Sequence, residues 1–217
     1  MTRQALNDLL SELQGRTQEI SVLVQRAMGS AVDIVLTGEA AAPIRIGALD
    51  RTIRADSAAL AERCLEVIAM QQPVATDLRL VMATMSVATD LERIGNHARG
   101  IVRLLRRLQR ESPESAPAPP LGALVQQVQV FLRDALAALA THDASGARSH
   151  LSVDRQIDAA YAAFSREQLR QMAAHPETLG IGMTLLKVAH KLERIGDRVS
   201  NIDERTVWIH LGELPTG

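Results

Sequence analysis

Two similar stretches, identical at six of eleven positions, decide the fold of this chain: LERIGNHARGI at residues 91–101 and LERIGDRVSNI at residues 192–202. Their glutamates are Glu92 and Glu193, so the offset between the copies is 193 − 92 = 101 residues. A match at this distance in a chain of 217 residues indicates an internal duplication, in which each copy makes up about half of the protein.

Apolar residues recur at steps of three and four through each stretch, which is the spacing of an amphipathic helix. The first copy has Thr84, Val87, Leu91, Ile94, Ala98 and Ile101 at these steps, and the second has Leu185, Val188, Leu192, Ile195, Val199 and Ile202. We call these positions the repeat seam. The spacing predicts one long helix in each half, packed along equivalent faces.

The rest of each half follows the same order. LDRTIRADSAAL at 49–60 aligns with VDRQIDAAYAAF at 153–164 at an offset of 104, and further helical patterns cover 6–34 and 121–139. Pro73 and Pro176 mark the turns before the last helices. We therefore predict an all-α fold of two tandem pseudosymmetric three-helix bundles, with six long helices. Residues 1–110 form the first repeat, the proline-rich stretch 111–120 the linker, and residues 121–217 the second repeat.

Composition narrows the class of protein. Apolar residues make up 47% of the chain but only four are aromatic, so the core must be aliphatic, and 24 basic against 25 acidic residues argue against nucleic-acid binding. The single Cys64 suits a reducing compartment, and we expect it to be buried and inert. The N-terminus lacks a secretory signal, and no stretch approaches the roughly 20 uninterrupted apolar residues of a membrane span. We expect a cytoplasmic protein with no direct membrane insertion.

Acidic pairs accompany the seam in the second half. Glu193 and Asp197 are four residues apart on one helix, and Asp154 and Asp158 repeat this spacing on the preceding helix. Each acid follows an apolar core position by one or two residues, so we expect the carboxylates on the flank of the helix contact. A cation would relieve their mutual repulsion, and carboxylate oxygens suit Mg²⁺, Mn²⁺ or iron. His190, one turn before Glu193, can add a nitrogen ligand.

The alternative is a structural role, in which the acids solvate an exposed helix face and Arg194 neutralises Asp197. At the equivalent positions the first half carries Asp50, Arg54, Glu92 and Asn96. A guanidinium and an amide thus replace two of the four carboxylates. The second half is the better candidate for a metal site, and Asp50, Glu92 and Asn96 are the weaker set.

A run of arginines lies toward the end of the third helix of the first half. Its members are Arg99, Arg103, Arg106, Arg107 and Arg110. Cations near a helix C-terminus complement the helix dipole and solubilise the end of the helix. The alternative is docking on an acidic partner or a membrane surface.

The pair DLERIGNHARGI and KLERIGDRVSNI resembles the PhoU family of phosphate-transport regulators, as do TDLRLVMATMSVATD at 76–90 and the D-x-x-I-D form of DRQID at 154–158. The resemblance covers both halves. It implies a homodimeric, non-enzymatic cytoplasmic protein that negatively regulates phosphate uptake and the phosphate-starvation response. It also implies metal ions at E/D-x-x-x-D motifs on the protein surface. Glu193 with Asp197 matches such a motif, and Asp154 with Asp158 matches the paired acids of the neighbouring helix. The first half departs from the motif at Arg54 and Asn96.

The partners that this resemblance implies are the ATPase subunit of a phosphate ABC transporter and a membrane sensor histidine kinase, which would hold the protein at the inner face of the membrane. The implied cofactors are surface ions of iron, zinc, magnesium or manganese, and none is required for catalysis. An accessory regulator of a different, low-affinity phosphate or ion transporter is an open alternative. A di-metal helical-bundle enzyme is disfavoured, because such sites use Glu-x-x-His pairs and this chain has none.

Overall fold

The computed structural model describes residues 3–39, 43–113 and 118–212. The long helices are α1 (Arg3–Thr37), α2 (Pro43–Gln71), α3 (Ala75–Glu111), α4 (Gly122–Thr141), α6 (Leu151–Ala174) and α7 (Leu179–Leu211). The described ranges also contain a short helix α5 (Ala144–Ser149) and the 3₁₀ turns η2 (Pro119–Leu121) and η3 (Pro176–Thr178). These ranges contain no strand, so the predicted all-α fold with six long helices is confirmed.

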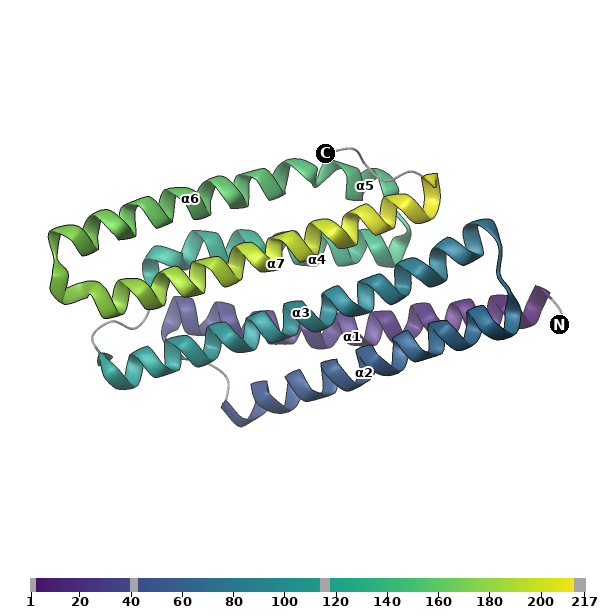
Figure 1. Cartoon of the computed structure of the whole chain (residues 1–217), viewed down its shortest axis with the longest axis horizontal. Coiled ribbons are helices and arrows are strands. Elements are labelled where there is room, and N and C mark those ends of the chain that lie inside the picture. Colours follow the sequence, from purple (N-terminus) through teal and green to yellow (C-terminus); the bar gives the residue numbers. More distant parts are fainter. Residues whose placement is uncertain (1–2, 40–42, 114–117, 213–217) are drawn as a thin grey trace.

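The helices run roughly side by side in an elongated molecule (Figure 1). Helices α1, α3, α7 and α4 contact one another in a ring, since α1 packs on α3, α3 on α7, α7 on α4 and α4 on α1. Helix α2 packs on α1 and α3, and α6 packs mainly on α7, so these two helices lie on the outer edges. Each repeat is thus a three-helix unit, and the third helices α3 and α7 join the two units.

The repeat seam lies inside the protein, as the spacing predicts. All of its residues in both copies are buried, and all except the polar Thr84 belong to one hydrophobic core that is continuous through both repeats. Cys64 is also fully buried in this core, and burial raises the pKa of its thiol to about 11. Because the thiolate is the reactive form, the expectation of an inert cysteine agrees with this environment.

The second and third helices of each repeat approach closely at equivalent points. A β-carbon added at Gly95 would lie 3.0 Å from Cδ1 of Ile53, and one added at Gly196 would lie 3.3 Å from Cγ2 of Ile157. The glycines are 196 − 95 = 101 residues apart and the isoleucines 157 − 53 = 104, the same offsets that align the two halves. The shared contact supports a duplication of the whole three-helix unit.

The connections follow the prolines. Pro73 lies between α2 and α3, and Pro176 opens η3 between α6 and α7. Residues 114–117 of the predicted linker lie outside the described part of the chain, and beyond them the backbone N–H of Ala118 donates to the carbonyl of Val35 at 3.0 Å. This hydrogen bond ties the end of the predicted linker to α1.

One described helix, α1, is long and apolar enough to cross a membrane by length and composition. Half of its most apolar window is buried inside the protein. The core helix of a globular protein has the same property, so this feature is weak support for a membrane span.

Candidate metal centre

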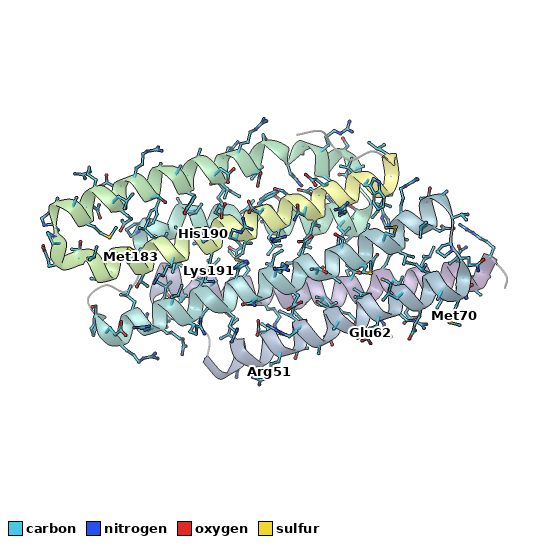
Figure 2. All side chains as sticks on the ribbon, in the orientation of Figure 1. Arg51, Glu62, Met70, Met183, His190 and Lys191 are labelled. Atoms are coloured by element: carbon cyan, nitrogen blue, oxygen red, sulfur yellow. The ribbon has the colours of Figure 1, made fainter. Side chains whose placement is uncertain are left out.

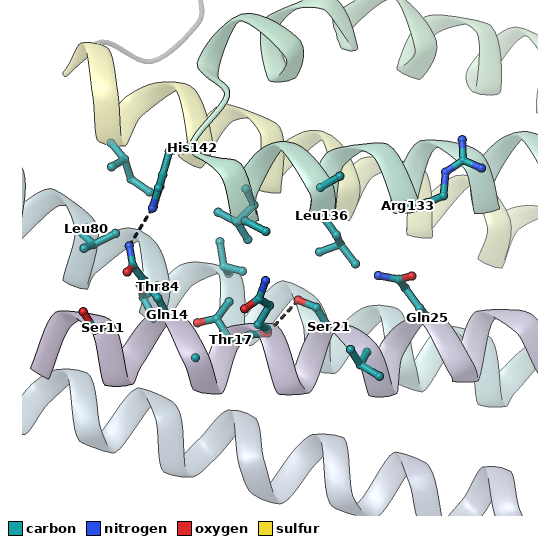
Figure 3. Close-up of a pocket in the computed structure, with 18 residues that line it drawn as sticks. Ser11, Gln14, Thr17, Ser21, Gln25, Leu80, Thr84, Arg133, Leu136 and His142 are labelled. Carbon is teal, nitrogen blue, oxygen red and sulfur yellow. Dashed lines mark hydrogen bonds between the residues drawn. The ribbon is translucent and has the colours of Figure 1, made fainter. Parts of the chain in front are cut away.

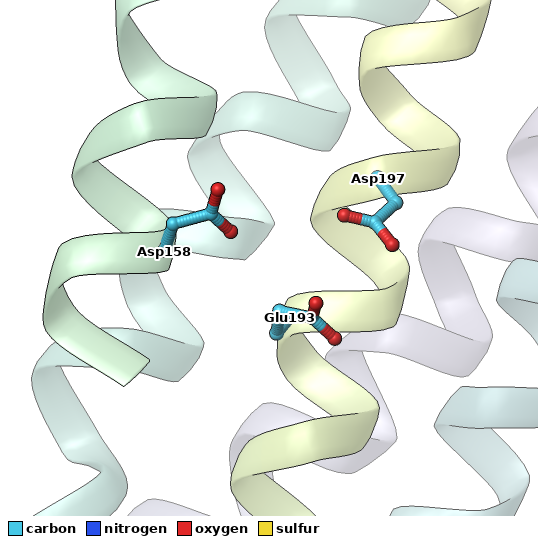
Figure 4. A group of neighbouring side chains, drawn as sticks. All are labelled: Asp158, Glu193 and Asp197. Atoms are coloured by element: carbon cyan, nitrogen blue, oxygen red, sulfur yellow. The ribbon is translucent and has the colours of Figure 1, made fainter. Parts of the chain in front are cut away.

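Three of the four predicted second-half acids meet on the flank of the α6–α7 contact (Figure 4). Asp158 comes from α6, and Glu193 and Asp197 come from α7. One carboxylate oxygen of each lies within 4.8 Å of the others. We call these three residues the carboxylate cluster. Within the described ranges it is the one group of three or more potential metal ligands at this spacing.

The close approach of the two helices explains why these acids meet. Ile157 packs against Gly196, and Asp158 and Asp197 are the next residues on their helices. Glu193 lies one turn before Asp197 on the same face. Asp158 is exposed, whereas Glu193 and Asp197 are partly buried, so the carboxylate cluster lies at the surface of the bundle.

Repulsion and partial burial make the carboxylate cluster a poor place for negative charge. Partial desolvation, followed by the charges of Asp154 and Asp197, raises the pKa of Asp158. Desolvation, followed by the charge of Asp197, also raises the pKa of Glu193. Oxygen Oε2 of Glu193 is buried and accepts no hydrogen bond. A bound cation would coordinate this oxygen and reduce the repulsion between the carboxylates.

The side chains of Arg194 and His190 already contact two of these carboxylates. The guanidinium of Arg194 lies 2.7 Å from Asp197, which is the ion pair that the structural alternative predicts. Nδ1 of His190 lies 3.3 Å from Oε2 of Glu193. A single arginine and a histidine face three carboxylates, so a surplus of negative charge is left for a metal ion even with both pairs formed.

Asp154, the fourth predicted ligand, lies outside the carboxylate cluster. Its carboxylate accepts a hydrogen bond of 2.7 Å from the hydroxyl of Ser200. Asp154 still acts on the site, because its charge helps to raise the pKa of Asp158. The remaining donors are all oxygens and fit a hard divalent cation, since ligands on opposite sides of such an ion are roughly 4–5 Å apart. A bound ion would supply positive charge that links α6 to α7.

The weaker first-half set is organised by ion pairs. Arg54, the equivalent of Asp158, lies 3.7 Å from Glu92, and Arg99 lies 3.2 Å from Asp50. Asn96 is exposed. Arginines of the same repeat neutralise both acids. The described residues of the first half therefore form no cluster of carboxylates.

A cavity of about 550 Å³ lies between α1, α3, α4 and α7 (Figure 3). Its lining includes Gln14, Thr17, Ser21 and Gln25 of α1, and no carboxylate. Gln14 contacts His142, the residue that caps the C-terminus of α4, and the two Nε2 atoms are 3.0 Å apart. The lining also includes the guanidinium of Arg133 and several apolar side chains, and without a carboxylate it does not suit a metal ion. These polar residues recur at steps of three and four along α1, and this sequence pattern could have indicated a polar cavity beside the helix.

A buried acid–histidine pair is a second feature that the sequence patterns did not reveal. Asp203 on α7 is 1% exposed, and its Oδ2 lies 3.1 Å from Nδ1 of His150 at the start of α6. Burial raises the pKa of Asp203 to about 7, although His150 acts in the opposite direction. The two residues are 53 positions apart, so no local motif joins them.

Both repeats match a family model. The PhoU domain matches residues 17–105 and again residues 122–206, one match on each side of the proline-rich stretch. The chain belongs to the PhoU family. The resemblance seen in the two LERIG stretches is therefore confirmed, and the PhoU match in each half agrees with the equivalent helix contacts at Gly95 and Gly196.

Similar PhoU proteins cover most of this chain. A protein of Pseudomonas putida described as a phosphate-specific transport system accessory protein PhoU homolog is 29% identical over 96% of this chain and 82% of its own length. A protein of the same description from Streptococcus pneumoniae is 35% identical over 76% of each chain. The crystal structure of PhoU from Pseudomonas aeruginosa superposes with a TM-score of 0.91 at 27% identity, covering 95% of this chain and 99% of that one.

Proposed function

We propose that this chain, an accessory protein of a phosphate-specific transport system, is a non-enzymatic cytoplasmic adaptor. In this role it couples the ATPase subunit of a phosphate ABC transporter to a membrane sensor histidine kinase and represses the starvation response when phosphate is plentiful. The adaptor is expected to act as a homodimer and to reach the inner face of the membrane through these partners.

The observation that carries the proposal is the family match in both repeats, together with relatives described as phosphate-specific transport system accessory proteins. The fold suits such a role, because six long helices present extended faces to which partner proteins can bind. The carboxylate cluster lies at the surface of the bundle, where a metal would order an outer face and not a buried reaction chamber.

Affinity capture in the native host tests the adaptor. The tagged chain, cross-linked in phosphate-replete cells, should recover the transporter ATPase subunit and the kinase by mass spectrometry, and deletion of the gene should switch on starvation genes in rich phosphate. Recovery of a different permease would favour the alternative regulator of a low-affinity transporter. Recovery of neither partner, with a normal starvation response in the deletion strain, would overturn the proposal.

We further propose that Asp158, Glu193 and Asp197 hold a divalent metal ion that fixes α6 against α7. Elemental analysis of protein purified without chelators should find bound iron, zinc, magnesium or manganese. The double substitution Glu193→Gln with Asp197→Asn should abolish it, because it removes two of the three negative ligands at nearly constant shape. Glu92→Gln is the matched control, since it changes the same position of the first LERIG copy, where Arg54 pairs with the acid. Equal metal in the wild type and the double variant would defeat this second proposal and leave the adaptor role intact.

A further inference from the structure

Thr84 is the one polar residue of the repeat seam. The other seam positions are apolar in both copies, and the equivalent of Thr84 in the second repeat is Leu185 (185 − 84 = 101). Leu185 packs in the hydrophobic core, whereas Thr84, which is 6% exposed, lines the cavity between α1, α3, α4 and α7 (Figure 3). The polar exchange in the seam therefore falls where the bundle is hollow.

The hydroxyl of Thr84 has no hydrogen-bond partner among the described residues. Two other buried threonines donate to the carbonyl four residues earlier, as Thr17 does to Leu13 at 2.8 Å and Thr206 does to Ile202 at 2.9 Å. A buried hydroxyl without a partner is costly, so nearly all such groups in proteins are satisfied. A hydroxyl on the wall of a cavity can be satisfied by a molecule bound in that cavity.

Helix α1 forms a polar wall beside Thr84. Thr17 and Ser21 are buried, and each donates its hydroxyl hydrogen to a carbonyl of α1 itself, at 2.8 Å in both cases. Both oxygens keep lone pairs that can accept a hydrogen bond from a ligand. Gln18 and Gln25 lie at the exposed rim, where each carboxamide can both donate and accept. This wall suits groups that donate and accept together, such as hydroxyls and amides.

The facing wall of the cavity is aliphatic. Helix α4 contributes Leu136, Ala137 and Ala140, and α3 adds Leu80 and Val87. Among the described residues no Phe, Tyr or Trp lines the cavity, so a nucleobase or another flat ring finds no aromatic side chain to stack on. An alkyl chain suits these walls, because burial of apolar surface and dispersion contacts are all that it requires.

The charges around the cavity favour an uncharged ligand. No carboxylate lines it, so a cationic head would lack a counterion. The guanidinium of Arg133 is largely exposed and lies 2.8 Å from the carboxylate of Asp134, with which it is already paired. The volume of about 550 Å³ is ample for a small molecule, since ligand pockets typically measure roughly 300–1,000 Å³.

We propose that this cavity binds an uncharged aliphatic amphiphile of the monoacylglycerol type. Its alkyl chain lies along the α4 wall, and its hydroxyl-bearing head reaches Thr84 and the polar wall of α1. The alkyl chain replaces the contacts that Leu185 makes at the equivalent position of the second repeat, and the head supplies the partner that the Thr84 hydroxyl lacks.

The cavity is separate from the carboxylate cluster. Figure 2 shows His190, which contacts Glu193, on α7. The α7 residue that lines the cavity is Ile209, which follows Glu193 by 209 − 193 = 16 residues, or roughly 24 Å of helix. The proposed ligand site thus goes beyond the adaptor role and does not depend on a bound metal.

Isothermal titration calorimetry of the full chain with matched probes tests the head and the chain of the ligand separately. 1-Monooctanoylglycerol, used below the concentration at which it aggregates, should bind. Octanoate and octyltrimethylammonium carry similar alkyl chains with a charged head and should bind at least about tenfold more weakly, because a charge placed in the cavity has no free counterion. Glycerol lacks the alkyl chain and should show no measurable binding.

Substitutions of Thr84 separate recognition from packing. Thr84→Val removes only the hydroxyl and should weaken binding of monooctanoylglycerol about fivefold, as expected for the loss of one neutral hydrogen bond. It should not lower the Tm, because the hydroxyl has no partner within the described residues. Thr206→Val is the matched control. It should lower the Tm, since the hydroxyl of Thr206 donates to Ile202, and it should leave binding unchanged.

Filling the cavity should abolish binding. Thr84→Leu introduces the residue that the second repeat has at this position, and Ala137→Phe places a large side chain on the aliphatic wall at an exposed position of α4. The proposal is overturned if monooctanoylglycerol does not bind, if a charged probe or glycerol binds equally well, or if both filled variants bind like the wild type. Equal losses of Tm in Thr84→Val and Thr206→Val would also overturn it, by giving the Thr84 hydroxyl a structural role. None of these outcomes affects the capture of transporter or kinase, so the two proposals fail independently.

Discussion

In the first repeat Glu92 lies 3.7 Å from Arg54, whereas in the second repeat the equivalent Glu193 lies in a cluster with Asp158 and Asp197. The backbone contact beneath these groups is the same, since Gly95 packs on Ile53 just as Gly196 packs on Ile157. One half therefore carries its own counterion, and the other leaves a surplus of negative charge. The comparison shows that a duplicated scaffold can keep its contacts while its flanks acquire different chemistry.

The two repeats also differ in the polarity of an equivalent residue inside the bundle. Val102 on α3 is buried and apolar, and its equivalent on α7 is the buried Asp203 (203 − 102 = 101), which meets His150. At the repeat seam five of the six equivalent pairs are apolar in both halves, and one pair, Thr84 and Leu185, differs in polarity. Chemistry has diverged beside the seam, and packing has been retained within it.

The largest effect is expected where the two repeats are most alike. Leu91→Ala and Leu192→Ala each remove a fully buried side chain at equivalent seam positions and should each lower the free energy of unfolding by about 2–5 kcal/mol. Urea unfolding followed by circular dichroism measures both. A loss below about 1 kcal/mol for one of them, with the full loss for the other, would show that the two halves do not share an equally tight core.

Exchanging the flank residues tests the metal asymmetry. Arg54→Asp with Asn96→Asp gives the first repeat the acids that the second has at these positions, and should add about one further bound metal ion per chain. Asp158→Arg makes the opposite exchange and should abolish binding in the second repeat, because the new guanidinium can pair with Glu193 as Arg54 pairs with Glu92.

Elemental analysis and equilibrium dialysis with Mn²⁺ measure both exchanges. The single Asn96→Asp variant is the control, since it leaves Arg54 in place as the counterion. Metal content that stays constant across these variants would mean that the difference between the repeats has no bearing on metal binding.

Much of the fold could be predicted from the two LERIG stretches, because a repeated three–four spacing fixes which face of a helix is buried. The seam residues, the six long helices and the turns at Pro73 and Pro176 follow from local patterns of this kind. The short helix α5 could not be predicted in this way. It is six residues long and is capped by Asp143, too short to show an apolar period.

The candidate site was predictable only in part. Spacing of four along one helix puts Glu193 beside Asp197, but the position of Asp158 opposite them depends on how closely α6 approaches α7. Asp154 has the same spacing from Asp158 and nevertheless turns to Ser200. The partner of Asp203 is His150, which lies outside α7, so the burial and charge environment of Asp203 are properties of the assembled bundle.

The Asp203–His150 pair should give the second repeat a pH dependence that Val102 cannot give the first. The pKa of Asp203 is raised from 3.8 to about 7, so the folded protein holds a proton that the unfolded chain releases. The associated stabilisation is present below about pH 4 and is lost as the pH rises to about 7. Because Asp203→Asn cannot ionise, its free energy of unfolding should not fall in this way. Between about pH 4 and about pH 7 the wild type should lose on the order of 1–3 kcal/mol more stability than the variant.

Chemical unfolding at a series of pH values checks this prediction. Asp134→Asn is a useful second variant, because the charge of Asp134 contributes to the raised pKa of Asp203 and its removal should move the decline to slightly lower pH. Parallel pH profiles for the wild type and Asp203→Asn would mean that Asp203 titrates as an exposed acid.

The smallest effect is expected at α5, a helix for which the described part of the first repeat has no counterpart. The carboxylate of Asp143 accepts a hydrogen bond of 2.8 Å from the N–H of Gly146 and caps the helix. Asp143→Ala should cost about 0.5–2 kcal/mol of stability, and Asp143→Asn, which keeps an acceptor, should cost much less. Gly146→Ala should resemble Asp143→Ala, because its β-carbon would collide with the capping carboxylate. Equal stability of all three variants and the wild type would mean that packing of the buried Ala147, and not the cap, holds α5 in place.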